Sequence, residues 1–236
     1  MLIPNINEQY HLYGILLIAS LVIGLFIPGI KLAKTGIRKD VLLCVAILNM
    51  FLALFCGKIY SMISAGSIDI FRTGFSSLGG LIGFLIGTYI FYFICDKDKR
   101  ILENYILSLP LIYAISKMGC FFAGCCHGIE YNGIFSVRYD VGSACRVESD
   151  VFPVQLAETV VFLGIYLLFS FKKMVNNKVT VILLVSAVAK FSLDFLRYSH
   201  MGKIVTSNQI VCGVIIILCI ALFVFGKRKM NTFKWG

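Results

Sequence analysis

Cysteine and histidine occur together beside glycines in one short stretch of this chain. Residues 116–128 read SKMGCFFAGCCHG, which places Cys120, Cys125 and Cys126 close to His127. Thiols and imidazoles are nucleophiles, proton carriers and metal ligands, so this stretch is the first candidate for chemistry. We treat these four residues as candidate catalytic residues.

Three kinds of chemistry fit this Cys/His stretch. A structural disulfide is plausible if the stretch faces an oxidising exterior, since Cys145 follows nearby. A catalytic thiol activated by His127 or Lys117 is the sharpest hypothesis. Zinc fits less well, because Cys125, Cys126 and His127 are too closely spaced for the usual C-x-x-C pattern. We therefore expect no metal and no other cofactor.

Charged side chains also interrupt several long apolar runs. Lys58 lies in LALFCGKIYSMI, Lys117 lies in LIYAISKMGCFF, and VAKFSLDFLRYSH contains Lys190, Asp194 and Arg197. A charge near the bilayer centre costs about 2.5–3.5 kcal/mol on insertion scales, so such residues usually pair or line a polar cavity. The spacing of the last three places them on one helix face. They form either a structural ion cluster or a cationic pocket for the phosphate of an anionic lipid.

An acidic residue, Glu158, lies within another apolar run, PVQLAETVVF. Gln155 precedes it by about one turn on the same face of a helix. Glu158 either pairs with one of the lysines or acts as a general base.

Glycines recur in the run SSLGGLIGFLIG at residues 76–87. Gly79, Gly83 and Gly87 form a stripe of small residues that would let two helices approach closely. The alternative is a break in the backbone near Gly79 and Gly80 that admits a ligand.

The composition of the chain identifies the elements that must position these residues. The 236 residues are 59% hydrophobic and 14% charged, whereas soluble domains are about 45–50% apolar and about 25% charged. Lipid must therefore cover much of the surface, and long apolar runs without alternation favour helices over a barrel. We predict an all-α, polytopic membrane protein with seven transmembrane helices in a single domain, residues 1–236. The predicted spans are 12–30, 41–63, 77–95, 101–122, 153–171, 179–198 and 208–226.

Lysine and arginine in the connecting segments predict the orientation of the helices. The cytoplasmic side should carry Lys31, Lys34, Arg38, Lys39, Lys97, Lys99, Arg100, Lys172, Lys173, Lys178, Lys227, Arg228, Lys229 and Lys234. The N-terminus and the long loop 124–152 are then outside, and the C-terminus is cytoplasmic. The net charge of +10 reflects these topology signals. We expect no nucleic-acid partner, because the loops are too short to build a groove.

Several separate motifs follow one another in an order typical of a known family. They are Tyr13-Gly14, GGLIG at 79–83, the G-x-F-x-x-G core at 119–124 with Gly128, PVQLAE at 153–158, KFSLDFLR at 190–197 and SNQ at 207–209. In these motifs, from about residue 12 to 226, the chain resembles the prolipoprotein diacylglyceryl transferases. The resemblance implies a bacterial cell-membrane enzyme that moves a diacylglyceryl group from phosphatidylglycerol to a lipoprotein cysteine. We expect it to be a monomer.

The resemblance, together with the residue chemistry described above, suggests roles for individual residues. The expected catalytic residues are Tyr13, Lys117, Cys120, Cys125, Cys126, His127, Glu158 and Lys190, and the expected substrate-binding residues are Lys58, Gly79, Gly80, Gly128, Gln155, Asp194 and Arg197. Lys117 and Lys190 stand where that family has arginine, and Asp194 stands where it has glutamate.

Other positions depart further from the family pattern. Leu78 and Phe152 stand where histidines are expected, Cys120 and Ala123 replace asparagines, and Cys125 replaces an acid. Two alternatives therefore stay open. One is a same-fold enzyme that uses a Cys/His site for another lipid or acyl transfer, and the other is a degenerate homologue that only binds lipid or lipoprotein.

Overall fold

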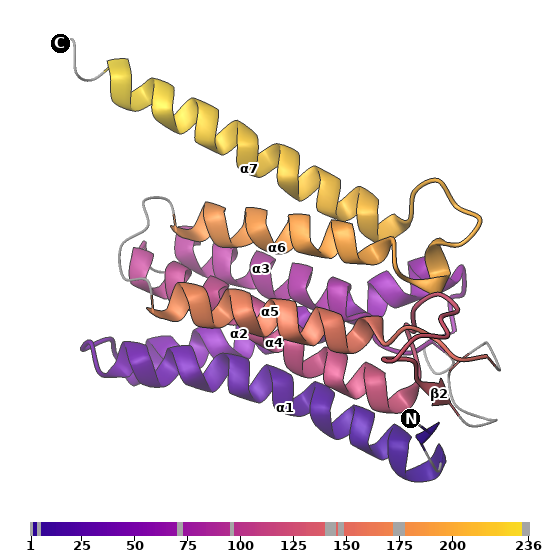
Figure 1. Ribbon diagram of the computed structural model, residues 1–236. Coiled ribbons are helices and arrows are strands. Elements are labelled where there is room, and N and C mark those ends of the chain that lie inside the picture. Colours follow the sequence, from indigo (N-terminus) through magenta and orange to yellow (C-terminus); the bar gives the residue numbers. More distant parts are fainter. Residues whose placement is uncertain are drawn as a thin grey trace.

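Long helices lying side by side build this protein (Figure 1). The computed structural model describes residues 2–3, 6–69, 73–94, 97–139, 145, 149–171 and 178–232. The helices are α1 (Ile6–Ala33), α2 (Lys39–Ala65), α3 (Ser77–Ile94), α4 (Lys99–Ala123), α5 (Val154–Phe171), α6 (Lys178–Asp194) and α7 (Ser207–Thr232). A 3₁₀ turn, η1 (Tyr198–His200), precedes α7, and β1 (Leu2–Ile3) pairs in parallel with β2 (Arg138–Tyr139). The prediction of an all-α fold is confirmed.

Six of these helices are long and apolar enough to cross a membrane, so the chain is a multi-pass membrane protein. The exception is α6, which has 17 residues and contains Lys190 and Asp194. At 1.5 Å per residue it is about 25 Å long, slightly less than a hydrocarbon core of about 30 Å. The predicted count of seven spans is therefore supported for six helices and stays a prediction for α6.

Helix α4 forms the centre of the bundle. Its most apolar window is 83% buried, the highest share among the six apolar helices. It packs against α1, α3, α5 and α6, and its buried side chains include Tyr105, Tyr113 and Lys117. A lysine buried in such a helix must find its partners inside the protein.

The glycine stripe brings α2 and α3 into close contact. A Cβ atom on Gly83 would lie 2.0 Å from the Leu52 carbonyl oxygen, and one on Gly79 would lie 2.5 Å from Cβ of Tyr60. Because α3 runs unbroken from Ser77 to Ile94, these glycines serve helix packing. The alternative of a backbone break near Gly79 and Gly80 is wrong.

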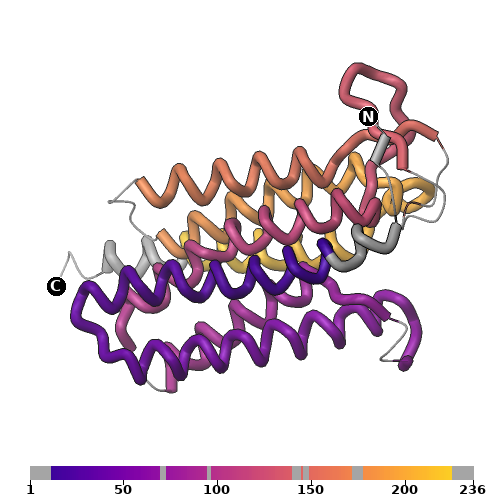
Figure 2. The backbone as a smooth tube through the Cα atoms, turned by 90° about the horizontal axis from the view of Figure 1, so that it is seen from below, coloured from indigo at the N-terminus to yellow at the C-terminus, as the bar shows by residue number. Residues whose placement is uncertain are grey.

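The remaining candidate residues gather at one end of the bundle. The C-terminal ends of α4 and α6 and the N-terminal ends of α5 and α7 meet there. The segment that follows α4 extends beyond the helix ends (Figure 2), and its strand β2 pairs with β1. The α1–α2 and α3–α4 connections, with their predicted cytoplasmic lysines and arginines, lie at the opposite end because successive helices reverse direction.

Candidate active site

A buried ion cluster lies where α4, α5 and α6 meet. Glu158 is at its centre: its Oε1 accepts hydrogen bonds from Lys190 Nζ at 2.5 Å and from the Tyr113 hydroxyl at 3.0 Å. Its Oε2 is 3.2 Å from Lys117 Nζ. Lys190 Nζ is also 3.3 Å from Asp194 Oδ1. One carboxylate thus joins two lysines from different helices.

Asp194 extends the cluster from α6 toward α7. Its carboxylate is 3.3 Å from Arg197 Nη1, and it accepts hydrogen bonds from the Thr206 hydroxyl and from Asn208 Nδ2, the latter at 3.3 Å. The Tyr60 hydroxyl donates to Asn208 Oδ1 at 3.2 Å, which links α2 to the same network. The start of α7 is therefore tied to the ion cluster by side-chain hydrogen bonds.

The ion cluster carries an excess of positive charge. Lys117, Lys190 and Arg197 are cations, whereas Glu158 and Asp194 are the carboxylates, and each of the five is at most 6% exposed. Three positive and two negative charges leave one net positive charge. Since an uncompensated buried charge is costly, this arrangement favours binding of an anion.

Lys58 adds a further cation at the same end of the bundle. Its ammonium donates to the Thr73 carbonyl and lies 5.0 Å from the centre of the Phe75 ring. No carboxylate among the described residues lies within 4.0 Å of it. Tyr13 lies nearby: its hydroxyl donates to the Phe75 carbonyl at 3.5 Å, and its ring packs against Gly119 of α4.

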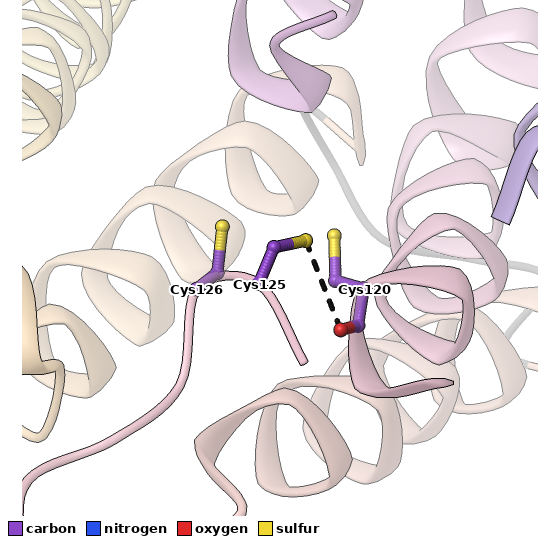
Figure 3. Close-up of side chains that lie close together, drawn as sticks. All are labelled: Cys120, Cys125 and Cys126. Atoms are coloured by element: carbon purple, nitrogen blue, oxygen red, sulfur yellow. Dashed lines mark hydrogen bonds between the residues drawn. The ribbon is translucent and has the colours of Figure 1, made fainter. Parts of the chain in front are cut away.

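Three thiols form a second cluster beside the ion cluster. Cys120 is in the last turn of α4, which ends at Gly124 with φ of 74°. Cys125 and Cys126 follow at once, and the three sulfur atoms lie within 4.8 Å of one another (Figure 3). The Cys125 thiol donates to the Cys120 carbonyl at 3.7 Å, while Gln155 of α5 donates to the Cys125 carbonyl at 2.8 Å. All three are free thiols.

Cys126 has an unusual backbone and an unusual electrostatic setting. Its φ is 58°, and it is the one described non-glycine residue with positive φ. Such strain in a residue with a side chain persists only where the surroundings hold it. Hydrogen bonds from Cys120 and Cys125 lower the pKa of its thiol well below the ordinary value, and Arg197 and Lys117 lower it further. These two cations connect the thiol and ion clusters.

His127 does not join the three thiols. Its ring is buried, with Nδ1 3.0 Å from the Gly128 carbonyl oxygen and the ring centre 5.0 Å from that of Tyr198. Gly128 pairs with Arg197, and a Cβ atom there would lie 2.4 Å from the Phe152 carbonyl oxygen. The loop therefore holds Arg197 in place through its backbone.

The structure brings most of the predicted site residues to one end of the bundle, but Tyr13, Lys58 and His127 lie beside the ion and thiol clusters rather than in them. Gly79 and Gly80 belong to the α2–α3 contact rather than to the ion cluster. Tyr113 and Thr206 are parts of the network that the sequence motifs did not indicate, whereas Asn208 belongs to the SNQ motif, to which no role had been assigned. Tyr113 lies one turn before Lys117, a spacing that could have revealed it, whereas Thr206 lies outside the predicted spans.

An apolar cavity approaches the ion cluster from within the bundle. It has a volume of about 70 Å³ and is lined by residues of α3 to α7, among them Pro110, Tyr113, Phe162, Lys190 and Cys212. Tyr113 and Lys190 thus contribute both to the cavity wall and to the ion cluster. The site combines buried cations with adjoining apolar space, which suits an amphipathic ligand.

The sequence of nearly the whole chain is similar to those of known proteins. A family model described as prolipoprotein diacylglyceryl transferase matches residues 2–225. A phosphatidylglycerol–prolipoprotein diacylglyceryl transferase of Clostridioides difficile is 26% identical over 86% of this chain and 88% of its own length. Enzymes of the same name from Clostridium perfringens and Clostridium tetani are 24% and 23% identical, and the matches cover 83% and 93% of each chain compared.

Proposed function

Because the chain belongs to the prolipoprotein diacylglyceryl transferase family, we propose that it transfers a diacylglyceryl group from phosphatidylglycerol to a cysteine thiol of a lipoprotein precursor. The named relatives carry this activity in their names. The observation that supports the proposal most is the convergence of Lys117, Lys190 and Arg197 in a buried cluster with one surplus positive charge. A phosphodiester carries one negative charge, so it complements that surplus.

The proposal also assigns an orientation in the cell membrane. We propose seven spans, including the short α6, with the N-terminus and loop 124–152 outside and the C-terminus in the cytoplasm. The excess of lysine and arginine at the opposite end of the bundle supports this orientation. The active site then lies toward the outer leaflet, where a monomer can receive both the phospholipid and the precursor.

The chemistry is a displacement at a glyceryl carbon. The acceptor thiolate attacks the carbon that bears the phosphate, a C–S bond forms, and the C–O bond breaks. Glycerol phosphate leaves with the electron pair of that bond. Negative charge therefore moves onto the phosphate, where Lys117, Lys190 and Arg197 stabilise it in a site that excludes water.

Glu158 positions cations in this mechanism. Its oxygens already face Lys117, Lys190 and the Tyr113 hydroxyl, so it is poorly placed to take a proton from a thiol. Tyr13 and Lys58 lie on the α1–α2 side and are proposed to contact the headgroup. His127 and Gly128 are proposed to shape the loop that holds Arg197.

The thiol cluster favours one second candidate function. A cysteine nucleophile would form a thioether with a diacylglyceryl group. A second acceptor could cleave that C–S bond only by displacing a thiolate from an alkyl carbon, where it is a poor leaving group, so such a relay suits this transfer badly. An acyl group would instead form a thioester, which a second acceptor can cleave. The position of Cys126 beside Lys117 and Arg197 makes acyl transfer from a lipid the alternative to test.

One assay distinguishes these functions. Purified protein is incubated with phosphatidylglycerol and a peptide that contains a lipobox cysteine, and the peptide is examined by mass spectrometry. We expect a diacylglyceryl mass gain on the cysteine that resists hydroxylamine. A gain that hydroxylamine removes would indicate an acyl thioester, and lipid binding without any gain would indicate a degenerate homologue.

The ion cluster is tested with a matched pair of lysine variants on α6. Lys190→Met removes a buried cation of the cluster, whereas Lys178→Met changes the same residue type at the other end of the helix. We expect Lys190→Met alone to abolish binding and transfer. Equal activity in both variants would contradict the proposed phosphate site.

A further inference from the structure

The geometry of the thiol cluster points to a metal site that the sequence pattern did not predict. We propose that Cys120, Cys125 and Cys126 bind one divalent thiophilic ion of the zinc class, with an open coordination position that receives the acceptor thiol. The binding site stands on the geometry of the three thiols alone. The role of the open position rests on the proposed function.

The distances among the three sulfur atoms are close to those of a bound ion. All lie within 4.8 Å of one another, whereas zinc–sulfur bonds of about 2.3 Å place thiolates about 3.8–4.0 Å apart. Small side-chain rotations would close that gap. The backbone is already arranged for it, because the left-handed residues Gly124 and Cys126 turn the chain back over Cys120.

The surrounding charges can accommodate thiolates. Lys117 and Arg197 both interact electrostatically with Cys126. A divalent ion with three thiolates carries one net negative charge, and a phosphodiester carries another. The surplus charge of the ion cluster and the ammonium of Lys58 supply two positive charges at the same end of the bundle.

The fourth coordination position has no protein ligand among the described residues. His127 was the obvious candidate, but it is not part of the group, and its ring contacts Gly128 and Tyr198. Cys120 is buried, whereas Cys125 and Cys126 are half-buried, so the open position would lie on the side of Cys125 and Cys126. Three protein ligands and one open position are typical of catalytic rather than structural zinc.

An open coordination position on the metal would provide a way to deprotonate the acceptor thiol, which the ion cluster does not. The acceptor thiol must lose its proton, and Glu158 is occupied by two lysines. A thiol that coordinates such an ion is deprotonated, and its proton passes to solvent. The bound sulfur then attacks the glyceryl carbon, the C–O bond breaks, and glycerol phosphate leaves with the electron pair. The resulting thioether is a weaker ligand than the thiolate and dissociates.

Metal content tests the site without reference to activity. The full-length protein is purified in detergent from cells grown with zinc, and its metals are measured by mass spectrometry. We expect about one zinc per chain, as for a three-cysteine site, and a thiolate-to-cobalt charge-transfer band after exchange with Co²⁺. Cys125→Ser and Cys126→Ser should lose both signals, whereas the matched control Cys44→Ser, outside the cluster, should keep them.

Adding substrate to the cobalt-loaded protein tests the metal site and the transferase function separately. Adding the lipobox peptide should shift the cobalt spectrum, and a peptide with serine in place of cysteine should leave it unchanged. Metal-free protein that transfers lipid at the normal rate would overturn the acceptor role of the metal. Cys126→Ser that retains its zinc would overturn the metal site itself. Both outcomes would leave the transferase proposal standing. Metal binding without any transfer activity would overturn the proposed function and the acceptor role, while the ion site would stand.

Discussion

Glu158 is the residue on which the buried ion cluster depends most. It is fully buried and contacts Lys117, Lys190 and Tyr113 from two neighbouring helices. Removing one partner from a buried ion pair leaves the other charge uncompensated, which costs more than the pair itself contributes. The integrity of the site is therefore more sensitive to Glu158 than to either lysine alone.

Replacing Glu158 by glutamine should destabilise the protein and stop transfer. The neutral amide leaves the buried ammonium of Lys117 without a carboxylate and that of Lys190 with Asp194 alone, so we expect a loss of about 3 kcal/mol or more in unfolding free energy. Thermal unfolding in detergent and the peptide assay measure the two effects. The control is Glu103→Gln, which lies in α4 but outside the ion cluster. It should change neither the melting temperature nor the transfer. An unchanged melting temperature in Glu158→Gln would contradict the structural role.

The spacing of charged residues predicted only part of this arrangement. Lys190 and Asp194 lie on one face of α6, so their contact followed from the helical period. The expectation that Arg197 shares this helix face was wrong, because α6 ends at Asp194 and Arg197 has an extended backbone. The pairing of Glu158 with Lys117 joins two helices and depends on how α4 and α5 pack. Sequence spacing within a helix contains no such information, although the cost of an isolated charge indicated that partners must exist.

The contacts within the thiol cluster were also not predictable from sequence spacing. The sequence reading grouped Cys125 and Cys126 with His127 because they are adjacent. In the structure, the left-handed residues Gly124 and Cys126 turn the chain so that Cys125 and Cys126 lie close to Cys120, five and six residues earlier, and His127 is not part of this group. The backbone conformation of two residues, Gly124 and Cys126, thus decided which side chains meet.

At the scale of elements, apolar length predicted the helices well and their ends less well. Predicted spans 77–95 and 153–171 agree closely with α3 and α5, because charged or turn-forming residues flank them. The first helix was expected to begin at residue 12 but begins at Ile6, where polar residues continue the helix beyond the apolar run.

Close contact between α2 and α3 should be disrupted by one methyl group. In Gly83→Ala the added Cβ would lie 2.0 Å from the Leu52 carbonyl oxygen, and such overpacking costs about 1–3 kcal/mol. We expect a lower melting temperature in detergent. Gly164→Ala is the control, since nothing lies within 4 Å of the added atom. Equal melting temperatures would show that the two helices separate without cost.

In the loop after α4, an added methyl group should lower the transfer rate more than the stability of the protein. In Gly128→Ala the new Cβ would lie 2.4 Å from the Phe152 carbonyl oxygen, which displaces the backbone that holds Arg197. A shift of about 1 Å can lower a rate about 100-fold, so transfer should fall far more than the melting temperature. Gly213→Ala, where the added atom meets nothing, should retain full activity.

For the whole molecule, the distribution of basic residues makes the orientation testable. Ile134 is 96% exposed at the end that contains the active site, and Thr35 lies in the α1–α2 connection at the other end. Cysteines introduced at these two positions should differ in labelling by a membrane-impermeant maleimide. The labelling of the parent protein, which has its own cysteines, is subtracted as background. Ile134→Cys should react in intact cells, and Thr35→Cys only after permeabilisation. The reverse pattern would place the C-terminus outside.

Helix α7 is joined to the rest of the molecule mainly at one end. Its apolar window is 17% buried, it packs on α6, and Figure 1 shows its C-terminal end far from the other helices. At its N-terminal end, Thr206 and Asn208 both donate to Asp194. This carboxylate also neutralises Lys190 and Arg197, the cations proposed to receive the phosphate.

The Asp194 carboxylate therefore couples two equilibria, which are the binding of the headgroup and the attachment of α7 to the bundle. Thermodynamic linkage makes this coupling reciprocal. A headgroup that draws the cations away from Asp194 changes how firmly that residue holds α7. Conversely, any lipid environment that moves α7 outward changes the affinity for the headgroup by the same factor. The surrounding bilayer would thereby act as an effector of the enzyme as well as its source of substrate.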